Sequence, residues 1–147
     1  MKREKIIAAA REWMGTPYKH QHMKKGLGTD CLGLLVGIYT ELYGKPEDEI
    51  PAYSPGWDEV ARREDMLRAA SKYLVARTDG KYDPGDVLVF RMKPGFVAKH
   101  CAIVSEPQKI IHAYQGLSVT EVYLVPWWAS RIAGIFKFPE VEEWHNS

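Results

Sequence analysis

Hydrophobic residues recur at helical spacing in the first half of the chain and at strand spacing in the second half. Residues 2–14 predict a helix because their apolar positions lie three or four residues apart, and Gly15 supplies a stop after it. A second helix is predicted at about Cys31–Tyr43, which is apolar on nearly all sides, as expected of a buried central helix. Gly33 and Gly37 within it indicate a face pressed closely against another element.

The middle of the chain predicts a surface loop and then a third helix. Residues 45–57 carry three prolines and no hydrophobic periodicity, which is typical of a loop. Asp58 can cap the helix that follows, with a break near Glu64. The apolar side of this helix consists of Val60, Leu67, Ala70 and Leu74.

Strand patterns begin after residue 84, and the gaps between them hold Pro, Gly or polar residues. The predicted strands are Val87–Phe90, 99–105, 109–114, 118–124 and 132–138. Trp127 and Trp128 predict a short packed turn, and the charged tail from Pro139 is predicted to fray. Helices followed by strands, without βαβ alternation, predict an α+β fold with a central antiparallel sheet of about five strands. We expect a single domain over residues 1–147.

Composition narrows the classes of partner. Hydrophobic residues make up 46% and charged residues 27% of the chain, which is ordinary for a globular protein. A formal net charge of +1 gives no reason to expect nucleic acid or an anionic membrane as a partner. Two cysteines do not make the disulfide framework of a secreted protein, and His20 with His22 alone is weak support for a metal site. No metal or cofactor is therefore expected.

The N-terminal residues include charges but no long apolar segment, so they do not predict a signal peptide. The apolar run of the second helix is too short and too often interrupted by glycine to span a bilayer. We therefore expect synthesis in the cytoplasm, and a target outside the membrane has to be reached by another route.

Cys31 is the first candidate for chemistry. Thr29 or Asp30 can cap the second helix, which puts Cys31 in its first turn. The unpaired N–H groups and the positive end of the helix dipole favour a thiolate there. Such a cysteine becomes a nucleophile once a histidine lies beside it. The alternative is a small buried hydrophobic residue in a core helix.

His100 and His112 are the candidate partners, on two predicted strands joined by a turn near Pro107. A three-residue loop between the strands places both imidazoles on one face of the sheet, whereas a two-residue loop places them on opposite faces. On one face they would supply a base for the thiol and a group that orients the base. The alternative is a pair of strand histidines that hydrogen-bond backbone or water and have no catalytic role.

Cys101 follows His100 directly and has the opposite strand parity. We therefore expect it to face away from the site and to fill the core. For the same reason a disulfide between Cys31 and Cys101 is not expected.

An ordered set of motifs covers most of the chain: Gly15-Thr16-Pro17-Tyr18, Gly28-Thr29-Asp30-Cys31-Leu32-Gly33-Leu34, Pro84-Gly85-Asp86-Val87-Leu88-Val89-Phe90, Lys99-His100 with Ala102-Ile103-Val104, and Ile111-His112-Ala113-Tyr114-Gln115-Gly116. This set resembles the NlpC/P60 family of cell-wall cysteine peptidases. Trp128 with residues 131–136 is similar to the pattern of members from phage, prophage and gene-transfer-particle gene clusters.

The resemblance implies a papain-like fold and a role for each site residue. Cys31 would be the nucleophile, His100 the general base and then acid, and His112 the orienting residue. Tyr18 matches a tyrosine whose hydroxyl points at the thiol and lines the oxyanion region, and Asp30 matches an acid that receives the substrate's free amino end in some members. Packing of the loop by Tyr18 and helix capping by Asp30 are the simpler roles.

The sequence departs from the family pattern next to the nucleophile. Leu32 stands where many members have a serine that contacts the substrate, and residues 19–22 replace a common pair of glycines. These differences alter the surface beside Cys31 at which substrate recognition takes place in the family.

The expected function is hydrolysis of an amide bond in peptidoglycan stem peptides, namely the bond from γ-D-glutamate to the diamino acid. The resemblance implies phage tail or gene-transfer-particle proteins as further partners and a phage-like particle as the carrier to the wall. One alternative is an amidase or acyltransferase that uses the same residues on another amide or ester. The other is a catalytically idle phage tail hub protein.

Overall fold

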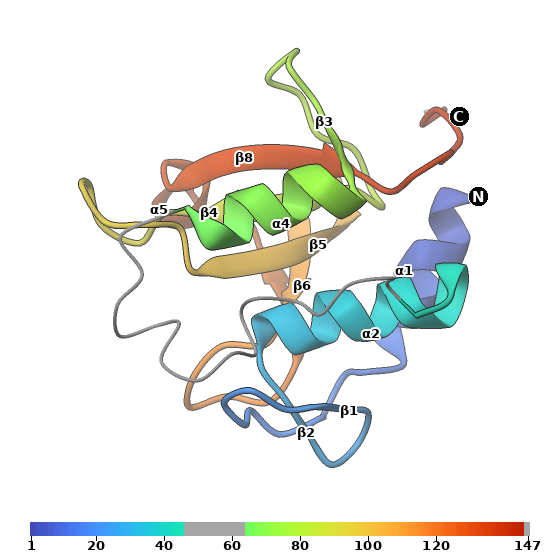
Figure 1. Cartoon of the computed structure of the whole chain (residues 1–147), viewed down its shortest axis with the longest axis vertical. Coiled ribbons are helices and arrows are strands. Elements are labelled where there is room, and N and C mark those ends of the chain that lie inside the picture. The colour runs from blue at the N-terminus through green and yellow to red at the C-terminus, as the bar shows by residue number, and fades with distance from the viewer. Residues whose placement is uncertain (46–63, 146–147) are drawn as a thin grey trace.

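The computed structural model describes residues 1–45 and 64–145 (Figure 1). In chain order the elements are α1 (Arg3–Arg11), β1 (Met23–Lys24), β2 (Gly28–Thr29), α2 (Cys31–Tyr43), α4 (Asp65–Tyr73), β3 (Val75–Ala76), β4 (Val87–Phe90), β5 (His100–Glu106), β6 (Lys109–His112), β7 (Thr120–Tyr123), α5 (Pro126–Ala129) and β8 (Ile132–Lys137).

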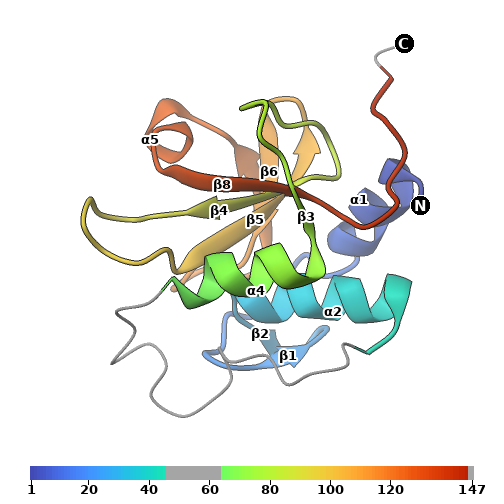
Figure 2. The ribbon, with the colours of Figure 1, turned by 45° about the horizontal axis from the view of Figure 1, so that its top comes forward.

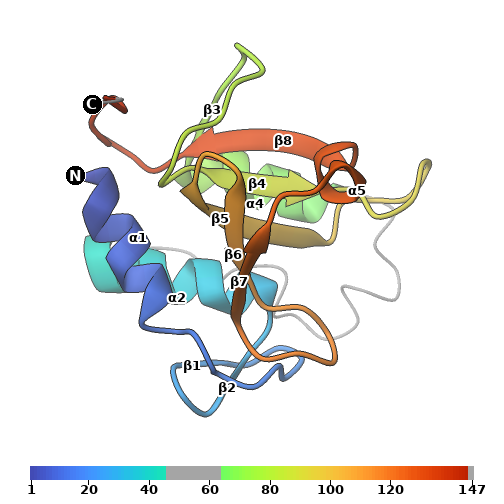
Figure 3. The same cartoon turned by 180° about the vertical axis from the view of Figure 1, so that it is seen from behind.

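Within these residues the strands form a six-stranded antiparallel sheet in the order β3-β8-β4-β5-β6-β7 and a separate two-stranded β1-β2 hairpin. Figure 2 shows α2 and α4 side by side beneath the sheet, with α5 where β8 begins. From behind, β6 and β7 continue the sheet past β5, and the β1-β2 hairpin lies below α2 (Figure 3). The predicted α+β architecture is therefore observed.

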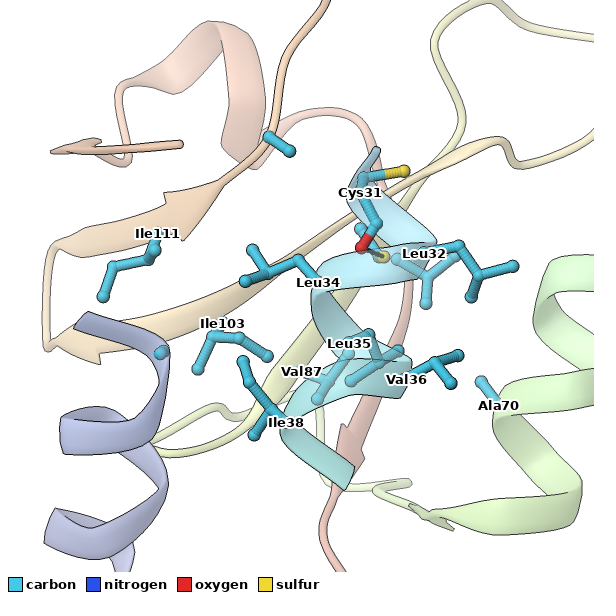
Figure 4. Close-up of a cluster of buried hydrophobic side chains, with 14 of the residues drawn as sticks. Cys31, Leu32, Leu34, Leu35, Val36, Ile38, Ala70, Val87, Ile103 and Ile111 are labelled. Carbon is cyan, nitrogen blue, oxygen red and sulfur yellow. Dashed lines mark hydrogen bonds between the residues drawn. The ribbon is translucent and has the colours of Figure 1, made fainter. Parts of the chain in front are cut away.

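The central strands β4, β5 and β6 are buried on both faces, which explains their apolar runs. On the helix-covered face, alternate residues of β4, β5 and β6 pack against α2, as Figure 4 shows for Val87, Ile103 and Ile111. On the other face, the intervening residues pack against Trp128 of α5. The central strands therefore carry chemistry only where a polar residue replaces an apolar one.

Helix α2 has the predicted bounds, because each end has a strong local signal. Asp30 caps it by accepting a hydrogen bond from the Gly33 backbone N–H at 2.7 Å, and Gly44 ends it with φ of 91°. A Cβ atom at Gly33 would collide with the His22 carbonyl, and one at Gly37 would collide with the Trp13 ring. The close approach predicted for these glycines is thus observed against residues 19–23 and the segment after α1.

Other predicted elements shift or fall outside the described residues. Helix α1 ends at Arg11, three residues early, and the chain continues in turns to Gly15. The predicted Trp127-Trp128 turn is the short helix α5, and β3 was not predicted because two residues give no periodic signal. The loop from residue 46 and the helix start at Asp58 and Val60 lie outside the described residues.

The predicted fraying of the tail from Pro139 is wrong as far as Glu142. The Glu142 backbone N–H donates to the Met1 carbonyl at 2.9 Å, and the Arg3 guanidinium donates to the Glu142 carbonyl at 2.7 Å. Phe138, just before the tail, is fully buried. The tail is thus tied to Met1 and Arg3 by hydrogen bonds to its backbone, which its charged composition does not indicate.

A buried ion pair holds α1 and β3 to the start of β4. The Asp86 carboxylate is fully buried and binds Arg3 at 2.8 Å and Arg77 at 2.6 Å. Arg3 also donates to the Pro84 carbonyl. These charged groups are buried, so each needs an oppositely charged partner. Removing one partner would leave the other charge desolvated without a compensating interaction.

Asp86→Ala leaves two guanidinium groups without their shared acceptor. We expect it to lower the free energy of unfolding by about 3–5 kcal/mol, the usual cost of breaking a buried pair, as measured by urea denaturation. Asp79→Ala is the matched control, because Asp79 binds the same Arg77 at 2.9 Å on the exposed surface and its loss should matter little. If both variants lost the same free energy of unfolding, the buried Asp86 carboxylate would not be the stabilising group.

Candidate active site

Cys31 is the first residue of α2, and Asp30 fixes this helix start twice. One carboxylate oxygen of Asp30 caps the helix, and the other accepts a hydrogen bond from the Gln21 backbone N–H at 2.8 Å. Gln21 adopts φ of 57°, which turns the loop of residues 19–23 over the helix end. The Cys31 N–H has no acceptor within its own helix and can serve an external oxygen.

Three consecutive residues at the start of β5 contact Cys31. The Cys31 thiol donates to the Lys99 carbonyl at 3.6 Å, and the Cys101 thiol donates to the Cys31 carbonyl at 3.3 Å. His100, between them, lines the same pocket as Cys31 and lies near enough to its thiol to lower the pKa of that thiol. The strand therefore fixes the cysteine from both sides.

Cys101 matches its prediction only in part. It lies in the core on the face of the sheet opposite the histidines, and both cysteines are free thiols. Its sulfur is nevertheless against the Cys31 backbone, so it does not face away from the site. Strand parity predicted the direction of the side chain, but not that α2 starts on that side of β5.

His100 and His112 lie on one face of the sheet, with Nε2 of His100 and Nδ1 of His112 2.8 Å apart. Glu106 pairs with Lys109 across a two-residue turn, a register that would put the histidines on opposite faces. A bulge between Val104 and Glu106 shifts the register by one residue, so that Val104 pairs with Ile110. The bulge therefore has the effect predicted for a three-residue loop.

Three aromatic rings enclose the two imidazoles. The Trp128 ring centroid lies 5.1 Å from each imidazole, Tyr114 lies 5.5 Å from His100 and 5.8 Å from His112, and Phe90 lies 5.7 Å from His100. Burial lowers the pKa of His112 to about 3, with a further contribution from the neighbouring His100. Sequence reasoning did not predict this enclosure, although Tyr114 has the strand parity of His112.

The thiol pKa of Cys31 lies well below its ordinary value. The neighbouring Cys101 side chain makes the largest contribution to this lower pKa, and His100 adds to it, while burial opposes them. Its position at a helix N-terminus acts in the same direction. Cys31 is 9% exposed, so this thiolate is sheltered and still reachable.

Cys31 and His100 open into a pocket of about 390 Å³ whose walls also include Tyr18, Met92, Lys99 and Tyr114. Tyr18 lines the same pocket as Cys31. Asp30 is 8% exposed, with both oxygens bonded to backbone N–H groups, and its observed role is capping the helix and holding the loop.

The hydrogen bond between the histidines sets the proton positions. Because His112 stays neutral, its Nδ1 can accept a hydrogen from Nε2 of His100, whether His100 is neutral or charged. This leaves Nδ1 of His100 for exchange of a proton with Cys31. The arrangement can therefore form a thiolate next to an imidazolium, with a second imidazole fixing the ring that carries the charge.

Among residues 1–45 and 64–145 no group of three or more His, Cys, Asp or Glu side chains could hold a metal ion. None of the helices in the same residues is long and apolar enough to cross a membrane.

Solved structures with the same architecture identify the fold. The NlpC/p60 domain of the peptidoglycan hydrolase SagA is 23% identical with a TM-score of 0.62, and the match covers 94% of this chain and all of that domain. The chain has the NlpC/P60 fold. An NlpC/P60 family protein from Bacillus cereus ATCC 10987 (23% identity, TM-score 0.66) and NlpC1 from Trichomonas vaginalis (17%, 0.67) each match 92% of this chain. The chain spans only 40% and 44% of these two proteins.

No family model matches the sequence, and no curated protein matches it. The predicted papain-like α+β fold of NlpC/P60 type is thus confirmed by structure and not by sequence comparison. At such low identities the likeness shows the fold, so the roles of the site residues depend on the geometry described above.

The pH dependence of stability in wild type and in His112→Gln tests whether the His112 imidazole is buried and neutral in the folded protein. The folded protein keeps His112 neutral, while the unfolded chain protonates it at an ordinary pKa near 6.5. The unfolded state then binds more protons below that pH, so stability falls as the pH drops from about 6.5 toward 3. We expect wild type to lose about 2 kcal/mol more unfolding free energy than His112→Gln between pH 7 and pH 5. Urea titrations at both pH values measure this difference, and equal losses would show that His112 is hydrated.

Proposed function

We propose that the chain is a member of the NlpC/P60 family and a cysteine peptidase that hydrolyses an amide bond in peptidoglycan stem peptides. The observation that carries this proposal is the contact between the start of α2 and the start of β5. There a thiol with lowered pKa lies beside His100, which is itself hydrogen-bonded to His112. The shared fold with the NlpC/p60 domain of the peptidoglycan hydrolase SagA supports the choice of substrate.

Each step of the proposed reaction uses a group already in place. The Cys31 thiolate attacks the carbonyl carbon, and the Cys31 N–H, with Tyr18 beside it, stabilises the developing oxyanion. His100 gives its proton to the leaving amine, which leaves an acyl-enzyme on Cys31. Water, deprotonated by His100, then releases the acid product, and His112 holds the imidazole in place throughout.

The bond we propose is the one from γ-D-glutamate to the diamino acid. Support for this choice comes from the sequence resemblance alone, and Leu32 departs from it. Leu32, in the first turn of α2, faces Met66 and Ala70 of α4. Its side chain is buried in the core next to the site and offers no hydrogen bond to a substrate.

We also propose that the protein is made in the cytoplasm and carried to the wall on a phage-like particle. The support is the similarity of Trp128 and residues 131–136 to the phage-type pattern. Immunodetection of the chain in purified particles tests this route separately from the chemistry, since its absence there would remove the route and leave the peptidase intact.

Muropeptide digestion tests the peptidase directly. Purified muropeptides incubated with wild type should give two fragments whose masses correspond to cleavage after γ-D-glutamate, while Cys31→Ala should give none. His100→Asn should slow the reaction by about 10²–10⁴-fold, the usual contribution of a general base. Mass spectrometry measures the products. Fragments from both wild type and Cys31→Ala, or from neither, would remove the proposal, and hydroxamate formed in added hydroxylamine would report acyl transfer instead of hydrolysis alone.

The alkylation rate of Cys31 separates an active enzyme from an idle hub. Because the thiol pKa is lowered, the reaction of Cys31 with iodoacetamide should reach its plateau well below the free-thiol pKa of about 8.5. Cys101 is an internal control, because the Cys31 thiolate and burial raise its thiol pKa well above the ordinary value. Peptide-level mass spectrometry follows both residues at once. A rate for Cys31 that rises only near pH 8.5 would favour the hub.

A further inference from the structure

Cys101 makes a polar contact that a residue serving only to fill the core would not need. Its thiol is 1% exposed, lies on the helix-covered face of the sheet, and donates to the Cys31 carbonyl at 3.3 Å. Figure 4 shows Cys31 at the beginning of the apolar face of α2, the position at which this contact is made. A valine or alanine would fill the same space among apolar neighbours but would leave that carbonyl without this donor.

The pKa values of the two neighbouring thiols are shifted in opposite directions, and their surroundings determine which one ionises first. The helix N-terminus and the His100 imidazole lie beside Cys31, so the negative charge develops there. A second negative charge next to it is unfavourable, and the pKa of Cys101 is accordingly raised. Cys101 therefore keeps its proton and remains a hydrogen-bond donor while Cys31 is a thiolate.

We propose that Cys101 is a positioning residue that fixes the first turn of α2 against β5, so that the Cys31 sulfur stays beside His100. Through this contact Cys101, the residue after the proposed base His100, holds the backbone of Cys31. His100 and Cys101 thus act from opposite faces of β5. The inference rests on the proposed role of Cys31 as nucleophile. It concerns a contact that neither the resemblance nor the strand pattern assigns.

The test compares substitutions that keep or remove the donor at position 101. Cys101→Ser keeps an O–H in place of the S–H, Cys101→Ala removes the donor, and Cys101→Val removes it while filling the space. For each variant, the rate of Cys31 alkylation by iodoacetamide is measured from pH 4 to pH 10 under reducing conditions. If the variants changed only the packing, their alkylation rates would not depend on whether residue 101 has a hydrogen-bond donor.

We expect Cys101→Ser to keep the wild-type pH profile. Cys101→Ala and Cys101→Val should move the midpoint to higher pH, with alkylation at pH 6.5 about fivefold slower, as expected for the loss of one hydrogen bond. Ile103→Val is the packing control, because it trims the same core cluster without a polar contact to Cys31. It should lower the thermal unfolding midpoint and leave the alkylation profile unchanged.

Two results would overturn the inference. One is a wild-type profile in Cys101→Ala and Cys101→Val, and the other is a Cys101→Ser profile that shifts as far as that of Cys101→Ala. Because alkylation needs no substrate, an activated Cys31 in wild type with no muropeptide cleavage would remove the proposed peptidase activity and leave the role of Cys101 supported. An ordinary thiol profile in wild type would overturn both.

Discussion

The contact between the N-terminus of α2 and the start of β5 is the constraint on which the site depends. It brings the thiol, the Lys99 carbonyl and the His100 imidazole together through residues that are adjacent on one strand. The Asp30 cap fixes the helix side of this contact, and the hydrogen bond to His112 fixes the strand side. Neither the capped start of α2 nor the buried histidine pair would indicate a reactive site by itself, since capped helices and hydrogen-bonded buried polar groups are both common.

Much of the fold could be predicted because its signals are local. Asp30 and Gly44 mark the ends of α2, and the apolar runs of β4 and β5 are bounded by turn residues. The strand β3 and the docking of the tail onto Met1 could not be predicted, because they depend on long-range contacts. The same distinction explains why the ends of α2 were predicted more closely than the edge of the sheet.

The candidate site was predictable as a set of residues and less so as a geometry. Cys31, His100 and Tyr18 reach one pocket, but the shared face of the histidines depends on the bulge near Ser105, for which the sequence has no evident signal. The two-residue turn alone would have predicted the opposite result. The aromatic enclosure was also missed, because Trp128 reaches it from α5, which lies beyond the hairpin in sequence.

The hydrogen bond between Met1 and Glu142 brings the two ends of the described chain to one corner of the molecule. Figure 1 shows this corner near the C-terminal end of α2, whereas Cys31 begins the opposite end of that helix. Neighbouring termini of this kind permit circular permutation or insertion of a domain into a host protein's loop. A support coupled at this corner would lie away from the helix end that carries Cys31 and would leave the pocket open.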